Sequence, residues 1–224
     1  MNTGARALAL ISVAGATSRA GKTALAASLL RGLSPGSASA VKFTTTDDVF
    51  ERCPRGKPCL VCDIDRPFRL VTEESVLRER GTDTDRLAEA GARRVVWAIA
   101  RRSAVAVAWA AVTPLVAGGP VVMEGSAITF EAKPALTFFV VHPFLDPARW
   151  KESASALLDS ADCVVVNRPA NETREPAAAV LEAIHARRGR RDVRIADVTA
   201  PLAAWGSDWA ERVATLAGEP ALSI

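Results

Sequence analysis

Short apolar runs rich in valine, alanine, isoleucine and phenylalanine alternate along the chain with segments of helical spacing. Runs that are apolar throughout are typical of parallel strands covered on both faces. Strands are predicted at about residues 7–14, 38–45, 94–100, 120–125, 136–142, 162–167 and 193–198. Helices are predicted at about residues 22–33, 83–91, 103–115, 148–159, 174–187 and 203–217. This alternation predicts an α/β fold of three layers, a mostly parallel sheet flanked by helices.

The length of the chain, 224 residues, suits one hydrophobic core, so residues 1–224 are predicted to form a single domain. The segment Thr46–Gly81 interrupts the alternation with Pro54, Pro58, Pro67 and many charges. It is too long for an ordinary connection between a strand and a helix. We therefore expect an insertion at about residues 46–81 that either has a function or is held in place by other groups.

Composition argues against a nucleic-acid or membrane partner. The net charge is only +3, and the arginines near residue 188 follow a helical pattern without interleaved aromatics, as at a solvated helix end. The uncharged stretch Ser103–Met123 contains two prolines and two glycines, so a buried helix followed by a strand is expected rather than a membrane span. The apolar N-terminal run continues directly into the first predicted loop, so cleaving it as a secretion signal would remove the first predicted strand. A cytoplasmic location is therefore expected.

A phosphate-binding loop is predicted between the first strand and the first helix, where the sequence reads ATSRAGKT. Its amides, at a helix N-terminus, favour a polyphosphate such as a purine nucleoside triphosphate. Lys22 would lie on the β and γ phosphates, Thr23 would offer a hydroxyl to Mg²⁺, and Gly21 would allow close approach of the backbone. The motif normally begins with glycine, whereas this chain has Ala16, preceded by Gly15. The cofactor-binding residues are predicted to be Ala16, Thr17, Ser18, Arg19, Ala20, Gly21, Lys22 and Thr23.

Carboxylates at two predicted element ends are candidates for holding the magnesium ion. Asp83 and Asp85 begin a helix, where they could cap it or coordinate a metal bound to phosphates. Glu124 ends an apolar strand, and ligands of α/β proteins bind at the carboxyl ends of parallel strands. It could hold Mg²⁺ or orient an attacking water, or it could simply turn into solvent. Thr23, Asp83 and Glu124 are the predicted magnesium ligands.

Lys42 and Asn167 also lie at predicted strand ends. Lys42 could reach the phosphates or an acidic substrate, or extend from the sheet edge into solvent. With Lys22 and Glu124 it completes the set of candidate catalytic residues. The amide of Asn167 could pair with the edge of a purine. The sequence after Asn167 lacks the N-K-x-D spacing that selects guanine, so GTP and ATP both remain candidates.

Three cysteines cluster in the insertion, as C-x5-C-x2-C at Cys53, Cys59 and Cys62. In a cytoplasmic chain such a cluster indicates zinc or an iron–sulfur cluster before a disulfide framework. Three thiolates leave a tetrahedral site one ligand short, which Asp63 or Asp65, a water or a second subunit could supply. A redox disulfide between Cys59 and Cys62, or unligated thiols, are the alternatives. Cys163, within an apolar run, is expected to be a small core residue.

Four segments together resemble the molybdopterin-guanine dinucleotide biosynthesis protein B family, a branch of the P-loop NTPases that also includes dethiobiotin synthetase and cobyrinate synthase-like proteins. They are ATSRAGKT after the first strand, VKF on the second, TDTDRLAEAGARRVV after the insertion and VVMEGS on a later strand. The resemblance covers roughly the first 130 residues. It implies a nucleotide-binding fold, Mg²⁺ dependence, a homodimer, GTP as the usual ligand and an accessory role in maturing the molybdenum cofactor, with a cofactor-biosynthesis protein as partner.

Three functions are consistent with these features. The first is a GTP- or ATP-binding accessory protein for a metal cofactor, with weak NTPase activity. The second is an ATP-dependent kinase or ligase in which Lys42 and the insertion hold a small acidic metabolite. The third is a non-enzymatic metal or redox sensor in which the nucleotide site only reports the state of the protein.

Overall fold

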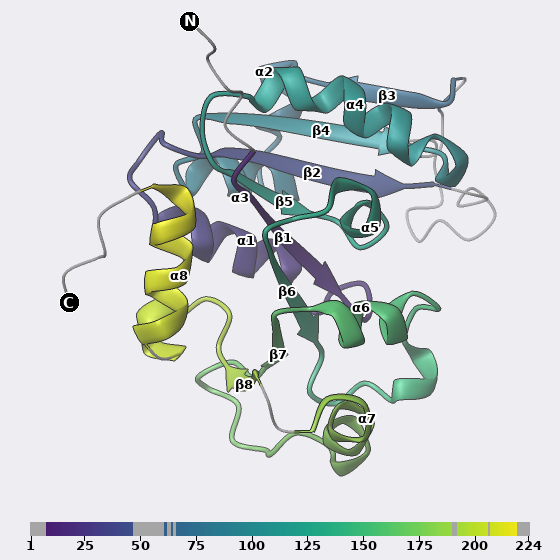
Figure 1. Ribbon diagram of the computed structural model, residues 1–224, viewed down its shortest axis with the longest axis vertical. Helices are drawn as coiled ribbons and strands as arrows, with labels where there is room; N and C mark the ends of the chain where they lie inside the picture. Colours follow the sequence, from purple (N-terminus) through teal and green to yellow (C-terminus); the bar gives the residue numbers. More distant parts are fainter. Residues whose placement is uncertain are drawn as a thin grey trace, which may run out of the picture.

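The computed structural model describes residues 8–46, 61, 64, 66–189, 192–205 and 207–218. Within these residues an eight-stranded sheet has the order β3-β4-β2-β5-β1-β6-β7-β8 (Figure 1). Neighbouring strands are parallel except for β3, which pairs antiparallel with β4 at one edge. The strands are β1 (Leu10–Gly15), β2 (Ser39–Thr45), β3 (Phe68–Val71), β4 (Arg94–Ala100), β5 (Val121–Glu124), β6 (Leu136–Val141), β7 (Cys163–Asn167) and β8 (Val193–Ala196).

Helices cover both faces of the sheet, which gives the three layers expected from the sequence. Buried side chains of α1, α3 and α8 pack against one face, and those of α4, α5, α6 and α7 pack against the other. The helices are α1 (Lys22–Arg31), α2 (Glu74–Leu77), α3 (Asp83–Glu89), α4 (Val105–Val116), α5 (Ile128–Ala132), α6 (Ala154–Ser160), α7 (Ala178–Arg188) and α8 (Ser207–Ala217). Short 3-10 turns occur at η2 (Arg102–Ala104), η3 (Pro147–Arg149) and η4 (Leu202–Trp205).

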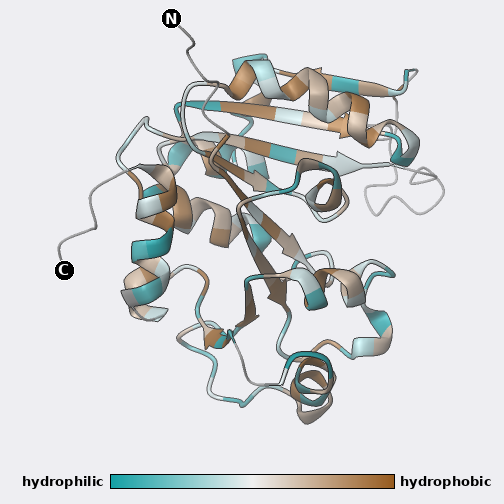
Figure 2. Ribbon diagram, viewed as in Figure 1, coloured by the Kyte–Doolittle hydropathy of each residue, from teal (hydrophilic) through white to brown (hydrophobic). Residues whose placement is uncertain are grey.

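The two faces are built by the alternation of side chains along each strand. On β7, Cys163 and Val165 join the core under α1 and α8, whereas Val164 and Val166 join the core under α6 and α7. Both sets are apolar, so the central strands are mostly hydrophobic along their length (Figure 2). Cys163 is fully buried, as expected, and this burial raises the pKa of its thiol to about 12.

Each predicted strand and helix is present, with boundaries shifted by a few residues. The helix predicted at about 148–159 is divided into the turn η3 and the later helix α6. The helix predicted from residue 174 begins at Ala178, two residues after Pro176, because the residue before a proline avoids the helical region. Three elements were not predicted. They are β3, α2 and α5, which are too short for a periodic pattern to identify.

The stretch Ser103–Met123 forms a helix followed by a strand, as predicted, but the helix is buried on one side only. Val107 on α4 is 60% exposed, while Ala108 and Val112 are fully buried against the sheet. The expected burial is therefore found on the face of α4 that meets the sheet, because α4 belongs to the outer layer of a three-layer fold. Among the described residues, no helix is long and apolar enough to cross a membrane.

Arginines near the end of α7 dock this helix onto α6 rather than forming a purely solvated end. Arg187 pairs with Asp159, and Arg188 donates hydrogen bonds to the carbonyls of Leu158 and Ala161. These contacts satisfy carbonyls at the C-terminus of α6, which lack partners within the helix itself.

The predicted insertion is described in part. Its later section supplies β3 and α2. β3 extends the sheet by one antiparallel edge strand. Cys53, Cys59 and Cys62 lie outside the described residues, as do the neighbouring candidate ligands Asp63 and Asp65.

Candidate functional site

The loop between β1 and α1 is held in a specific backbone conformation. The N–H of Ala16 donates to the carbonyl of Val140 on β6 at 3.0 Å. Arg19 and Gly21 have positive φ values of 60° and 109°. Glycine is required at position 21, because a Cβ there would collide with the amide of Asn167 in addition to the cost of the left-handed conformation.

Lys22, the first residue of α1, folds back over the loop. Its ammonium donates to the carbonyl of Thr17 at 2.9 Å. Gly15 makes room for this side chain, since a Cβ there would lie 2.9 Å from both Cγ and Cδ of Lys22. Glycine is therefore needed one position before the usual first glycine of the motif. Ala16, at the usual first position, is fully buried beside β6.

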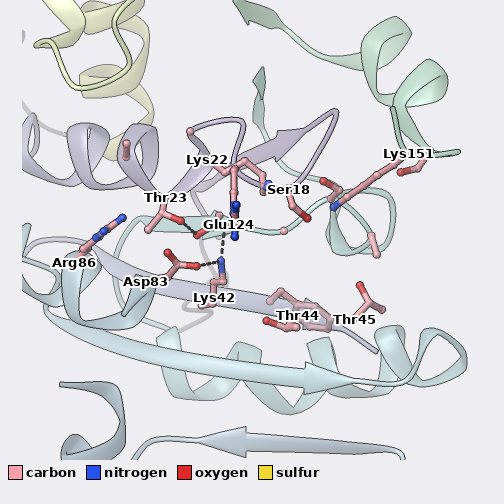
Figure 3. Close-up of a pocket in the computed structure, with 18 of the residues that line it drawn as sticks. Ser18, Lys22, Thr23, Lys42, Thr44, Thr45, Asp83, Arg86, Glu124 and Lys151 are labelled. Carbon is pink, nitrogen blue, oxygen red and sulfur yellow. Dashed lines mark hydrogen bonds and ion pairs between the residues drawn. The ribbon is translucent and has the colours of Figure 1, made fainter. Parts of the chain in front are cut away.

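Thr23, Glu124, Lys42 and Asp83 form one polar cluster below the loop (Figure 3). The hydroxyl of Thr23 donates to Oε2 of Glu124 at 2.9 Å. The ammonium of Lys42 lies 2.6 Å from Oε1 of Glu124 and 2.7 Å from Oδ2 of Asp83. Glu124 is 2% exposed, so the alternative in which this carboxylate turns into solvent was wrong. Lys42 likewise lies inside the cluster rather than extending into solvent, with its side chain 16% exposed.

The charges in this cluster stabilise one another. Burial lowers the pKa of a lysine, but the carboxylates of Glu124 and Asp83 outweigh that effect and raise the pKa of Lys42 above its ordinary value. Burial would raise the pKa of Asp83, but the Lys42 ammonium outweighs it and lowers that pKa. In the part of the chain that the structure describes, Lys22 forms no ion pair with a carboxylate. Burial and the positive charge of Lys151 lower the pKa of Lys22 to about 8.

Asp83 and Asp85, which are two residues apart in sequence, have different roles in the structure. Thr82 caps α3, since its hydroxyl accepts a hydrogen bond from the N–H of Asp85 at 3.3 Å. The carboxylate of Asp85 accepts from the N–H of Gly81 at 3.0 Å. Both bonds join Asp85 to the two residues before the helix, so Asp85 serves the helix end while Asp83 faces Lys42.

A cavity of about 900 Å³ lies over this cluster. The phosphate loop contributes Ser18, Arg19, Gly21, Lys22 and Thr23 to its wall, whereas Ala16, Thr17 and Ala20 lie behind the wall. The described basic residues of the wall outnumber its carboxylates. They are Arg19, Lys22, Lys42, Arg86, Arg102 and Lys151, against Asp83, Glu124 and Glu152.

Asn167 lies beside the loop, and its amide is engaged by backbone groups. Its Nδ2 donates to the carbonyl of Ala20 at 3.0 Å, and its Oδ1 accepts from the N–H of Val198 at 3.4 Å. Asn167 is not among the described residues that line the cavity. The structure thus shows a contact with the loop backbone, and pairing with a purine stays a prediction.

Sequence reasoning missed several residues of the cavity wall. Ser126 links the loop after β5 to the phosphate loop, because its Oγ accepts from the N–H of Gly15 at 3.1 Å. Lys151 and Arg102 lie outside the motifs of the sequence, and only the fold brings them to the cavity. Ser126 and Arg86 had a usable signal, since they lie in the segments VVMEGS and TDTDRLAEAGARRVV.

Among the described residues, no group of three or more histidine, cysteine, aspartate or glutamate side chains is arranged to hold a metal ion. The predicted cysteine site falls outside that part of the chain, so the structure does not test it.

The sheet and the phosphate loop define an α/β protein with the three-layer P-loop NTPase fold. Among solved structures, the chain is similar to HypB from Helicobacter pylori in complex with nickel. The TM-score is 0.51 and the identity 11%, with 97% of this chain and 92% of that chain covered. At this identity the similarity shows the fold, so the resemblance drawn from sequence is confirmed for the fold class only. No protein-family model and no curated protein matches the sequence.

Proposed function

We propose that this protein binds a purine nucleoside triphosphate together with Mg²⁺, hydrolyses it slowly and acts as an accessory in maturing a metal cofactor. The observation that carries the proposal is the contact between Thr23 and the buried carboxylate of Glu124, beside Asp83 and below Lys22. A hydroxyl on the first turn of α1, a strand-end carboxylate and a lysine over the loop are the parts that a P-loop NTPase uses.

The donor set fits Mg²⁺, which prefers oxygen ligands. Thr23 would supply a hydroxyl and Glu124 and Asp83 would supply carboxylates, directly or through water. The Lys42 ammonium lies between the two carboxylates, which marks this position as one that attracts a cation. When bound there, Mg²⁺ would neutralise the charge of the phosphates.

The protein's own residues would bind and orient the triphosphate. Amides of the loop at the start of α1 face an anion, and Lys22 adds a positive charge that can leave the carbonyl of Thr17 for a phosphate oxygen. Glu124 would orient a water toward the terminal phosphate through the oxygen not used by Mg²⁺.

The accessory role has two supports. The sequence resembles a family that matures the molybdenum cofactor, and the fold is similar to that of a protein solved in complex with nickel. The molybdenum pathway, GTP as the usual nucleotide and a cofactor-biosynthesis partner rest on the resemblance.

A kinase or ligase acting on a small acidic metabolite is a second candidate, and the extent of the cavity favours it. The cavity continues past the phosphate loop to Thr44 and Thr45 at the end of β2 (Figure 3). Arg102 also lines it. An acidic acceptor bound there would lie near the terminal phosphate. Turnover that requires such an acceptor would support this function, whereas turnover without one would support the accessory NTPase.

Calorimetric titration with Mg²⁺-GTP and Mg²⁺-ATP tests the proposal. Lys22→Ala should weaken triphosphate binding by about 10- to 100-fold, as expected for a charge-assisted contact. Arg31→Ala is the matched control, because it removes the same charge from the exposed end of the same helix. Unchanged triphosphate affinity in Lys22→Ala would overturn the proposal, and binding without turnover in the wild type would favour a sensor.

We also propose a homodimer, which the resemblance implies. Light scattering in the presence of nucleotide and Mg²⁺ should give twice the mass of the chain, 23.6 kDa. A monomer mass under those conditions would contradict this part of the proposal.

A further inference from the structure

Lys151 belongs to the wall of the cavity although it lies outside every motif of the sequence. It is in the loop between η3 and α6, and its N–H donates to the carbonyl of Ala16 at 2.9 Å. The backbone of Lys151 is therefore tied to the start of the phosphate loop. Figure 3 shows its side chain extending toward the loop near Ser18.

The three lysines of the cavity differ in what their ammonium groups contact. Lys22 donates to Thr17, and Lys42 is paired with two carboxylates. For Lys151, no hydrogen bond or ion pair of the ammonium is found with any part of the chain that the structure describes. Its side chain remains accessible to solvent, so a ligand can reach it.

Lys151 and Lys22 face the same space. Burial first, and then the positive charge of Lys151, lower the pKa of Lys22, so the two ammonium groups repel each other across the cavity. Burial and the charge of Lys42 likewise lower the pKa of Lys151. An anionic group that contacts both ammonium groups would remove this repulsion.

We infer that Lys151 binds the terminal phosphoryl group of the nucleoside triphosphate and makes the site prefer triphosphate over diphosphate. This inference rests on the proposed function. Loop amides at the start of α1 hold the phosphates closest to that helix, and Lys22 reaches the β and γ groups. Lys151 faces Lys22 across the cavity, so we place the γ phosphate, the outer of the two groups that Lys22 reaches, between the two ammonium groups.

The test compares the affinities of Mg²⁺-ATP with Mg²⁺-ADP, and of Mg²⁺-GTP with Mg²⁺-GDP, in the wild type and in Lys151→Met. The variant should weaken triphosphate binding about tenfold and diphosphate binding less than about twofold, since one charge-assisted contact is lost. Lys151→Arg should restore most of the preference. Arg149→Met is the matched control, because Arg149 is exposed on η3 and is not among the described residues lining the cavity.

Two other outcomes of this comparison would overturn the inference. An equal loss for both nucleotides would mean that Lys151 supports the loop or contacts a shared phosphate. No change for either would mean that it serves another anion, such as a carboxylate acceptor. If the wild type does not bind triphosphate, or if Lys22→Ala binds it as tightly as the wild type does, the proposed function is wrong instead. Thermal melts of each variant verify that the fold is retained.

Discussion

The hydroxyl of Thr23 donates a hydrogen bond of 2.9 Å to the carboxylate of Glu124, across 101 positions of sequence. One partner lies on the first turn of α1 and the other at the end of β5, and the two strands β1 and β5 are adjacent and parallel. This pairing brings the start of the helix after β1 and the end of β5 to the same edge of the sheet. The candidate magnesium site is a direct consequence of that arrangement.

Replacing Thr23 with valine should separate metal-dependent binding from binding by the loop amides. Valine keeps the shape of threonine but lacks the hydroxyl, so the Mg²⁺-triphosphate complex should bind about tenfold more weakly, as expected for one lost ligand contact. Affinity measured calorimetrically in EDTA should change little. Thr23→Ser restores the hydroxyl and should restore the metal-dependent part. An equal loss with and without Mg²⁺ would count against a metal-binding role.

Asp83 and Asp85 provide a matched pair of carboxylates for a second test. Asp83→Asn should reduce Mg²⁺-dependent nucleotide affinity, because Asp83 faces Lys42 in the cluster. Asp85→Asn should instead lower the free energy of unfolding by about 0.5–1.5 kcal/mol, since it weakens the hydrogen bond to Gly81. Urea denaturation measures the stability effect, and calorimetry measures the affinity. If Asp85→Asn lowers affinity as much as Asp83→Asn does, the assignment of the two roles is wrong.

Triphosphate affinity should fall as pH rises above about 8, the pKa of Lys22 in the nucleotide-free protein. An anion binds the protonated form and raises this pKa, so binding above pH 8 should take up a proton. Titrations in buffers of different ionisation enthalpy measure that uptake. Lys151→Met removes the positive charge that contributes most to lowering the pKa of Lys22, so the fall in affinity should move to higher pH. Glu124, Lys42 and Asp83 remain as charged neighbours of Lys22 in this variant. Constant affinity from about pH 7 to pH 10 would contradict this prediction.

The same shift affects stability in the nucleotide-free protein. Lys22 has an ordinary value of 10.5 in the unfolded chain and about 8 in the folded protein. Between these values the unfolded chain binds more protons at this position, so the contribution of Lys22 to the free energy of unfolding increases as pH rises through this window. Lys22→Met should remove that contribution, which urea denaturation at several pH values can measure.

The parts of the site that lie next to each other in sequence could be predicted, and those joined by the fold could not. The loop, Lys22 and Thr23 form one local motif, and Glu124 ends a recognisable apolar strand. Lys42 was placed at the end of the second strand, but it lies in the middle of β2, which continues to Thr45. The different roles of Asp83 and Asp85 depend on the capping geometry of Thr82, which spacing alone does not show. Lys151 reaches the site only because its backbone returns to Ala16 after β6.

The fold shows the same division. Apolar runs predicted the parallel strands because each strand is buried on both faces. The edge strand β3 has four residues, including Arg69, and its partner β4 comes later in the chain. No local pattern of that length distinguishes a strand from a loop.

The cysteine cluster remains a prediction from the sequence. Three thiols at Cys53, Cys59 and Cys62 should bind zinc or an iron–sulfur cluster, and metal ligation should order the loop around them. Replacing Cys59 and Cys62 with serine should lower metal content and make residues 50–70 sensitive to protease, while nucleotide binding is largely retained. Metal analysis and the visible absorption spectrum of anaerobically purified protein distinguish zinc from iron. Metal-free wild-type protein with an equally protease-resistant loop would refute this prediction.

Asn167 can be tested in a way that separates its contact with the loop from the predicted contact with a purine. In the structure its amide bonds Ala20 and Val198, so Asn167→Ala should lower the free energy of unfolding by about 1–2 kcal/mol. The loop would lose a support behind Gly21, which should weaken phosphate binding as well. Asn171→Ala is the matched control, because Asn171 is exposed four residues later.

Inorganic tripolyphosphate, which has no base, decides between the two roles of Asn167. If Asn167 acts by holding the loop, Asn167→Ala should weaken Mg²⁺-tripolyphosphate and Mg²⁺-nucleoside triphosphate binding by the same factor. If the amide pairs with a purine, the variant should weaken nucleotide binding more than tripolyphosphate binding, because only the nucleotide presents a base edge. Both bonds join the amide to backbone groups beside the loop, and Asn167 is not among the described residues that line the cavity, so we expect equal factors. A selective loss for the nucleotide would establish Asn167 as a base-recognition residue.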